Sequence, residues 1–164
     1  DQDQLHRGSR PRREGLALAV ASQQEQFRKL ASELQMMQGS AETLQQRLGV
    51  LQNAATDLGV AKTSIDSLKS GEKGDPILVP TGGGTFVKAK LGDLSTILIT
   101  IGADVSIEMG LDDAEQDLSE RFKEVEKARQ SVQNQLQQIL GQMEVHRDVL
   151  NRLSASLQGV EPAV

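Results

Sequence analysis

The sequence predicts an α+β protein: a long antiparallel two-helix coiled coil with two β-hairpins inserted at its base. In two long segments, apolar residues recur every seven positions, which is typical of coiled coils. Between them, from Pro76 to Met109, short β-branched runs are separated by glycine and aspartate, the pattern of successive hairpins. Aromatic residues are only 2% of the 164 residues, which favours two-faced helices over a thick core.

The first helical segment is predicted to span residues 16–70, and the capping-box spacing of Ser22 and Glu25 offers an alternative start at Ser22. Its two apolar series form an a/d seam that weakens at Lys62. Gly71 provides a stop signal. The first series is Leu30, Met37, Leu44, Leu51, Leu58 and Ile65, and the second is Phe27, Leu34, Ala41, Leu48 and Ala55.

The second helical segment is predicted to span residues 112–158, with acidic residues at its start and Gly159 closing it. Arg129 and His146 interrupt its seam, and polar core residues of this kind fix register at a cost in stability. Two such helices joined by a compact insert should fold back as arms on the order of 70 Å long. The seam residues are Leu118, Val125, Val132, Ile139 and Leu153, with Phe122, Leu136, Met143, Leu150 and Leu157 in the other series.

The insert, residues 71–111, is predicted to form the double β-hairpin and to drive association. Short isolated hairpins are marginal in water, and their free edges invite pairing with another chain. Alternation along the strands places apolar side chains on both faces. The residues expected at contacts between subunits are Val79, Phe86, Val87, Leu91, Ile97, Ile99, Ile101, Val105 and Ile107.

Composition excludes several classes of function. A net charge of -5 argues against nucleic-acid binding, and the absence of cysteine excludes disulfides and thiolate zinc sites. No apolar run approaches the length of a membrane span and no signal-peptide core is present, so a cytoplasmic protein is expected. The Gly82-Gly83-Gly84 run is no phosphate loop, because no Gly-Lys-Ser/Thr follows it. With no nucleophile–base pair, the sequence predicts no enzyme, no metal and no cofactor.

Both termini are expected to be tails. Residues 1–15 read as a disordered tail with a basic cluster around Pro11, and a functional basic arm is the alternative. Residues 159–164 form the C-terminal tail. The basic residues of the first tail are Arg7, Arg10, Arg12 and Arg13.

The free end of the arm is expected to carry an apolar cluster. If Ser70 and Asp112 mark the base, Gln24 lies level with Gln158, and everything before Gln24 overhangs. Apolar side chains at an unsealed tip mark a binding surface, unless the overhang simply frays and the other residues complete the seam. The cluster comprises Leu16, Leu18, Val20, Leu150, Leu153, Leu157 and Val160.

The order of heptad helix, double hairpin and heptad helix resembles the α-type subunits of the prefoldin family, co-chaperones of archaea and eukaryotes. The two hairpins distinguish α-type from β-type subunits in that family. Asp104 stands where the family usually has glycine, and aspartate tolerates left-handed φ better than most residues. The most specific stretch is Ile77-Leu78-Val79-Pro80-Thr81-Gly82-Gly83-Gly84-Thr85-Phe86-Val87-Lys88-Ala89, followed by Ile99-Thr100-Ile101-Gly102-Ala103-Asp104-Val105-Ser106-Ile107-Glu108.

The resemblance implies a hetero-hexamer of two α-type and four β-type subunits whose hairpins form intersubunit β-barrels. It also implies that the arm tips hold non-native client proteins without ATP and pass them to a group II chaperonin. No nucleic acid or membrane is implied as a partner. A coiled-coil scaffold or filament-forming relative remains the alternative, and an enzyme or nucleotide-binding protein would need measurable ligand binding.

Overall fold

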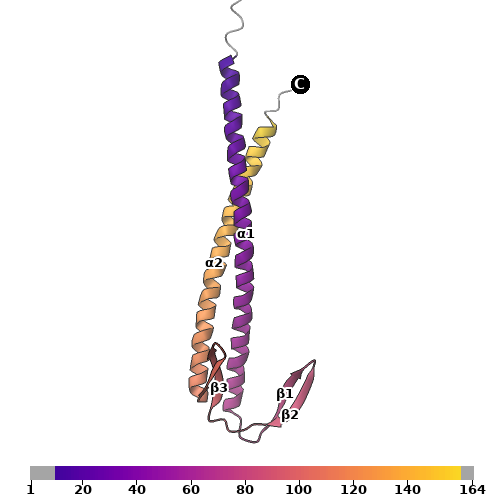
Figure 1. Ribbon diagram of the computed structural model, residues 1–164, viewed down its shortest axis with the longest axis vertical. Helices are drawn as coiled ribbons and strands as arrows, with labels where there is room; N and C mark the ends of the chain where they lie inside the picture. Colours follow the sequence, from indigo (N-terminus) through magenta and orange to yellow (C-terminus); the bar gives the residue numbers. More distant parts are fainter. Residues whose placement is uncertain (1–9, 160–164) are drawn as a thin grey trace, which may run out of the picture. The chain divides into compact units, whose positions relative to one another are not determined.

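The computed structural model describes residues 10–159, and it confirms the α+β class with two hairpins between two long helices (Figure 1). Two compact units divide the chain, one comprising Leu48–Ser131 and the other the described residues 10–47 and 132–159. Each unit contains part of both helices. In order, the elements are α1 (Arg10–Lys69), β1 (Pro76–Gly82), β2 (Thr85–Lys90), β3 (Ile97–Gly102), β4 (Val105–Met109) and α2 (Leu111–Gln158).

Helix α1 begins at Arg10, so the expected starts at residue 16 and at Ser22 are both too late. Pro11 lies in the first turn, where a backbone N–H has no intrahelical partner, so proline fixes φ there without losing a hydrogen bond. Leucine and alanine, both good helix formers, then dominate residues 16–21. Residues 10–15 of the expected tail are therefore helical, whereas residues 1–9 and 160–164 lie outside the described range.

In the Leu48–Ser131 unit, the two helices pair antiparallel around a small apolar core. Lys69 Nζ, at the end of α1, lies 3.0 Å from Asp112 Oδ1 at the start of α2 and also bonds Glu115. Lys62, where the predicted seam weakens, places its ammonium 5.1 Å from the centroid of the Phe122 ring. The buried core consists of Ile65, Ile99, Ala114 and Leu118.

In the other unit the helices also run antiparallel, around Ala41, Val132, Leu136 and Met143, which are all buried. Glu33 of α1 bonds His146 of α2, and the Ser156 hydroxyl lies 3.5 Å from Gln23 Oε1. The second contact lies within three residues of the predicted register. Heptad periodicity together with the position of the short insert therefore predicted the helix pairing closely.

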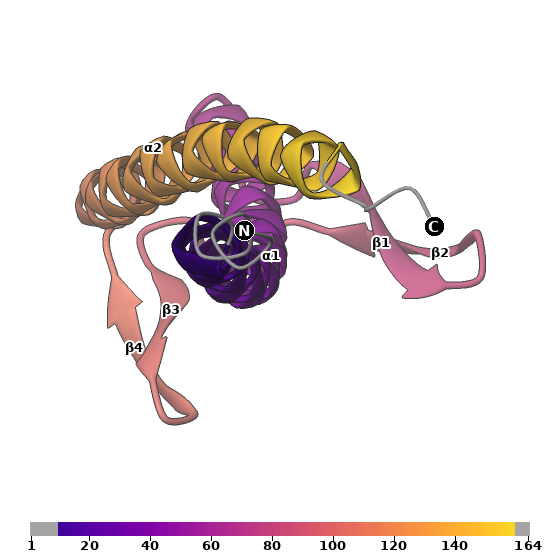
Figure 2. The ribbon, with the colours of Figure 1, turned by 90° about the horizontal axis from the view of Figure 1, so that it is seen from above.

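The strands form two separate two-stranded antiparallel sheets, β1 with β2 and β3 with β4 (Figure 2). Their two-residue turns have positive φ at both central positions, as in type I′ turns. Gly83 and Gly84 have φ of 58° and 78°, and Ala103 and Asp104 have φ of 43° and 60°. Asp104 adopts the expected left-handed conformation, while its neighbour Ala103 adopts it without the help of a polar side chain.

Candidate interaction surfaces

The β3–β4 hairpin packs apolar side chains against the helices of its own chain. Ile99 is 7% exposed and belongs to the core at the base of the helices, and Ile97 and Met109 pack against that core. Arg121 of α2 donates a hydrogen bond from Nη1 to the Thr100 carbonyl oxygen at 3.0 Å. Ile99, which the sequence places at a contact between subunits, therefore has almost no surface left for a partner, whereas Ile97 is only half-buried.

Leu91 also makes contacts within its own chain rather than lying on an open surface. Its backbone N–H donates to the Asp75 carbonyl oxygen at 2.8 Å, and its carbonyl oxygen accepts from the Gly74 N–H at 2.8 Å. Its Cδ1 would lie 3.1 Å from a Cβ added at Gly71. Leu91 is half-buried, and it closes the loop that follows α1.

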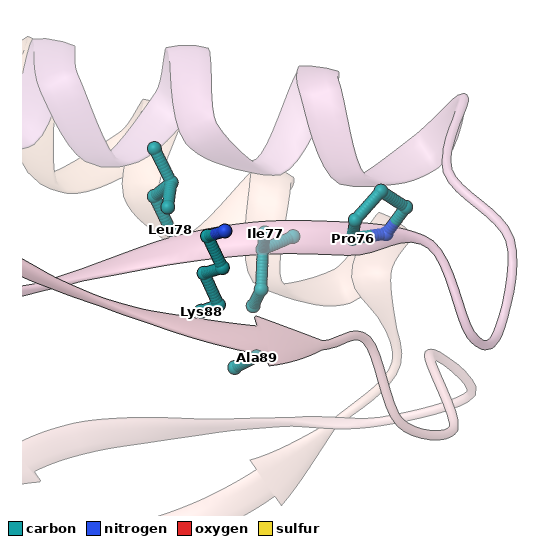
Figure 3. Close-up of a pocket in the computed structure, with 5 residues that line it drawn as sticks. All are labelled: Pro76, Ile77, Leu78, Lys88 and Ala89. Atoms are coloured by element: carbon teal, nitrogen blue, oxygen red, sulfur yellow. The ribbon is translucent and has the colours of Figure 1, made fainter.

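The β1–β2 hairpin is open on both faces within the described chain. Cross-strand pairs put Val79 beside Val87 on one face and Leu78 beside Lys88 on the other. Val79 and Val87 are 42% and 53% exposed, so the first of these faces is an uncovered apolar surface. A shallow hollow of about 350 Å³ in this hairpin is lined by Pro76, Ile77, Leu78, Lys88 and Ala89 (Figure 3).

Most of the other expected contact residues remain exposed. Phe86 lies on β2, Ile101 and Val105 flank the turn of the β3–β4 hairpin, and Ile107 lies opposite the buried Ile99 on the neighbouring strand. The name hairpin surface is used below for the exposed apolar residues of the two separate hairpins taken together. Its members are Val79, Phe86, Val87, Ile101, Val105 and Ile107.

The expected tip cluster divides into an exposed part and a half-buried part. Leu16 and Leu18 of α1 are 59% and 72% exposed, and Val20 is half-buried. On α2 the expected residues lie along the seam and are half-buried, so the structure does not join all members into one patch. These residues are Leu150, Leu153 and Leu157, while Val160 lies outside the described range.

Of the two polar seam residues, His146 contacts the other helix, whereas Arg129 pairs within its own helix. His146 is 18% exposed, and its Nε2 lies 2.9 Å from Glu33 Oε2. This contact raises the pKa of His146 above its ordinary value, more than partial burial lowers it. Sequence reasoning missed Glu33, although the predicted register places it near His146. Arg129 instead pairs with Glu126, one turn earlier on its own helix, at 2.9 Å.

The described residues offer interaction surfaces rather than reactive chemistry. Within residues 10–159, no group of three or more His, Cys, Asp or Glu is arranged to hold a metal ion. No helix in that range is long and apolar enough to cross a membrane. A two-helix scaffold with exposed apolar side chains on a hairpin and at a helix end defines a class of protein that associates with other proteins.

The chain belongs to the prefoldin family, because the Prefoldin subunit family model matches residues 37–156, and its similarity to alpha subunits of that family shows the α type. It is 31% identical to the prefoldin subunit alpha of Pyrococcus horikoshii over 73% of this chain and 82% of that protein. It is 33% identical to the prefoldin subunit alpha of Nitrosopumilus maritimus over 82% of this chain and 92% of that protein.

The fold is also similar to a solved structure. A chain of the filamentous PFD from Methanocaldococcus jannaschii matches with a TM-score of 0.58 and 20% identity, over 67% of this chain and 91% of that chain. Prefoldin is a family of chaperone subunits that assemble with other prefoldin subunits, and its members are not enzymes. The predicted family, the non-enzymatic character and the association with related subunits are thereby confirmed.

Proposed function

We propose that this chain acts in the cytoplasm as an ATP-independent holdase subunit. In this proposal it joins a second α-type and four β-type subunits in a hetero-hexamer. The arm tips capture non-native proteins and deliver them to a group II chaperonin. The observation that carries the proposal is the exposure of apolar side chains on both the hairpin surface and the start of α1.

The hairpin surface supports the assembly part of the proposal. Within residues 10–159, β1 and β2 each pair with only one strand, so each has a free edge that can accept a strand from a neighbouring subunit. A β-barrel shared between subunits would cover these edges and bury Val79 and Val87. Full burial of such a side chain contributes about 1.5–3 kcal/mol.

The exposed leucines at the start of α1 support the holding part of the proposal. A single exposed leucine, such as Leu16 or Leu18, binds a client only weakly. Several arms that hold one client raise the effective concentration, and avidity can strengthen binding about 10²–10⁴-fold without any new contact. Release then needs no nucleotide, because each grip is weak by itself.

The test compares two pairs of exposed apolar residues on the same helix. Leu16→Ser with Leu18→Ser should leave assembly with partner subunits intact but weaken suppression of aggregation of a denatured model client. The matched control is Val50→Ser with Val60→Ser, since these valines are 68% and 63% exposed. Equal suppression by the two variants at matched assembly would contradict client capture at the tip.

Delivery is tested separately, by the yield of refolded client. Adding a group II chaperonin and ATP to a preformed complex with client should raise that yield. Removal of residues 1–22 should reduce both capture and transfer. If the client is captured but not transferred, the holdase part of the proposal stands and the delivery part is rejected.

A scaffold or filament role is the second candidate. The observation that favours it is the similarity of the fold to a chain from a filamentous PFD. In that case the hairpins of identical chains would pair in an open series, and the arms would space bound partners. The two candidates differ in assembly size, as discussed below.

A further inference from the structure

The first turns of α1 continue the seam beyond the end of α2. Counting back by sevens from Phe27 gives Val20 and Arg13, and counting back from Leu30 gives Gln23 and Leu16. Gln23 is already level with Ser156, and α2 ends at Gln158. By the same count Gln158 lies level with Ala21, so residues 11–20 of α1, called the overhang below, extend past the end of α2. They include the seam positions Arg13 and Leu16, which are exposed, and Val20, which is half-buried.

The overhang is basic although the chain as a whole is acidic. The net charge of the chain is -5, yet Arg12 and Arg13 are both exposed and have no ion-pair partner among the described residues. No carboxylate side chain occurs from Gly15 to Gln24 of α1 or from Val149 to Gln158 of α2. The acidic residue nearest to them along α1 is Glu14. The two positive charges of Arg12 and Arg13 are therefore only partly balanced by the one negative charge of Glu14.

The charges and the apolar side chains lie side by side. Residues three or four apart on a helix are neighbours, so Arg12 and Arg13 both lie next to Leu16. A guanidinium donates two parallel hydrogen bonds to a carboxylate, a geometry that an ammonium does not reproduce. A bound segment that carries an acidic residue close to an apolar one can therefore pair its carboxylate with Arg12 or Arg13 while its apolar side chain contacts Leu16.

We propose that the overhang selects client segments in which acidic residues flank apolar ones. This inference rests on the proposed client-binding function and adds the chemistry of the preferred client. Leu16, with Val20 one turn further along the same face, holds the apolar residues, while Arg12 and Arg13 attract the acidic flanks and repel basic ones. Because the pairs are exposed, the preference weakens as salt screens them.

The test uses three labelled unstructured peptides with one shared Leu- and Phe-containing core and flanks of Glu, Gln or Lys. Their affinities for the full chain, assembled with its partner subunits, are measured by fluorescence anisotropy at low and high salt. At low salt we expect the Glu-flanked peptide to bind about 10-fold tighter than the Lys-flanked one. At high salt the ratio should approach one.

Two charge-reversal variants identify the residues responsible. Arg12→Glu with Arg13→Glu should invert the order of the Glu- and Lys-flanked peptides and leave the Gln-flanked peptide unchanged. Lys123→Glu with Lys127→Glu makes the same change in net charge at exposed positions of α2 and should preserve the order. Leu16→Ser should weaken all three peptides alike.

Each contrary result has a distinct meaning. Equal affinity for the three peptides, or an unchanged order after reversal at Arg12 and Arg13, overturns the acidic preference while leaving client capture intact. Concentration-dependent association that is lost on reversal identifies a second copy of the chain as the occupant and also overturns it. No binding of any peptide contradicts the proposed client-binding function itself.

Discussion

His146 presents both ring nitrogens to acceptors at the same time. Nδ1 lies 3.0 Å from the Gln142 carbonyl oxygen, and Nε2 lies 2.9 Å from Glu33 Oε2. A neutral imidazole carries one N–H, so only the protonated ring can donate to both acceptors. The hydrogen bond to Glu33 is the main reason that the pKa of His146 is raised.

The raised pKa predicts that the coiled coil is more stable in mild acid than in mild base. The folded pKa of His146 lies above its unfolded value of about 6.5. The stabilisation is therefore complete below that unfolded value and is lost as pH rises through the folded pKa. The Tm should be higher at pH 6 than at pH 8, and Glu33→Gln should remove much of this difference. An unaltered pH dependence in Glu33→Gln would contradict the assignment.

The contact between His146 and Glu33 also makes the expected effect of His146→Leu on the Tm depend on pH. An apolar residue at a seam position should raise the Tm, and this gain should be full at pH 8, where the parent imidazole is neutral. At pH 6 the gain should shrink, because the variant loses the ion pair with Glu33. Thermal melts of both proteins at the two pH values check this, and a lower Tm at pH 8 would refute it.

Ala103 carries a backbone cost that glycine would remove. Its φ of 43° lies in the left-handed region, which costs an L-residue roughly 1–2 kcal/mol. Ala103→Gly should stabilise the β3–β4 hairpin by about 1 kcal/mol after the extra flexibility of the unfolded chain is counted. Slower hydrogen exchange of β3 and β4 amides would show it. Asp104→Gly, at φ 60°, is the control and should gain less.

At the scale of elements, the two hairpins respond differently to charge. Val79→Asp with Val87→Asp places charge on the open face of β1–β2, so each chain should keep its fold while the assembly dissociates. Ile99→Asp buries an unpaired charge in the core of the chain itself and should instead lower its Tm. Light scattering and thermal melts separate the two effects. An intact assembly in the valine variant would contradict the role of the hairpin surface.

Helix α1 contains glycines that packing does not require. A Cβ added at Gly49 would meet no atom within 4 Å, whereas one at Gly71 would lie 3.1 Å from Leu91 Cδ1 and 3.3 Å from the Leu68 carbonyl oxygen. Gly49→Ala should therefore stabilise the helix by up to about 1 kcal/mol. Gly71→Ala, the steric control, should destabilise the protein. Thermal melts followed by circular dichroism measure both, and a destabilised Gly49→Ala variant would reveal a contact outside this chain.

At the scale of the whole molecule, assembly size distinguishes the hexamer from the filament. A hetero-hexamer predicts a closed particle of fixed mass that forms only when β-type subunits are mixed with this chain. A filament predicts growth of this chain alone, with mass rising with concentration, because heterologous contacts that do not close propagate. Light scattering with and without a β-type partner measures this directly. A stable monomer in the presence of that partner would contradict both.

The sequence by itself determined the helices, the hairpins and their order. Seven-residue spacing along Leu30, Leu44 and Leu58 encodes the seam, and two-residue alternation between glycine-rich turns encodes the strands. These signals are local, because each depends on neighbours a few positions away. The antiparallel register followed from the short insert, and a tip with exposed leucines followed from the unequal helix lengths.

Only the tertiary structure decided which apolar residues are left for partners. β1–β2 and β3–β4 alternate in the same way, yet Ile99 is buried against the helices while Val87 is exposed. The pairing of His146 with Glu33 likewise joins residues far apart in the sequence. Burial and ion pairing depend on long-range neighbours that no local pattern contains. The periodicity of the chain therefore established what forms, and the packing established what remains exposed.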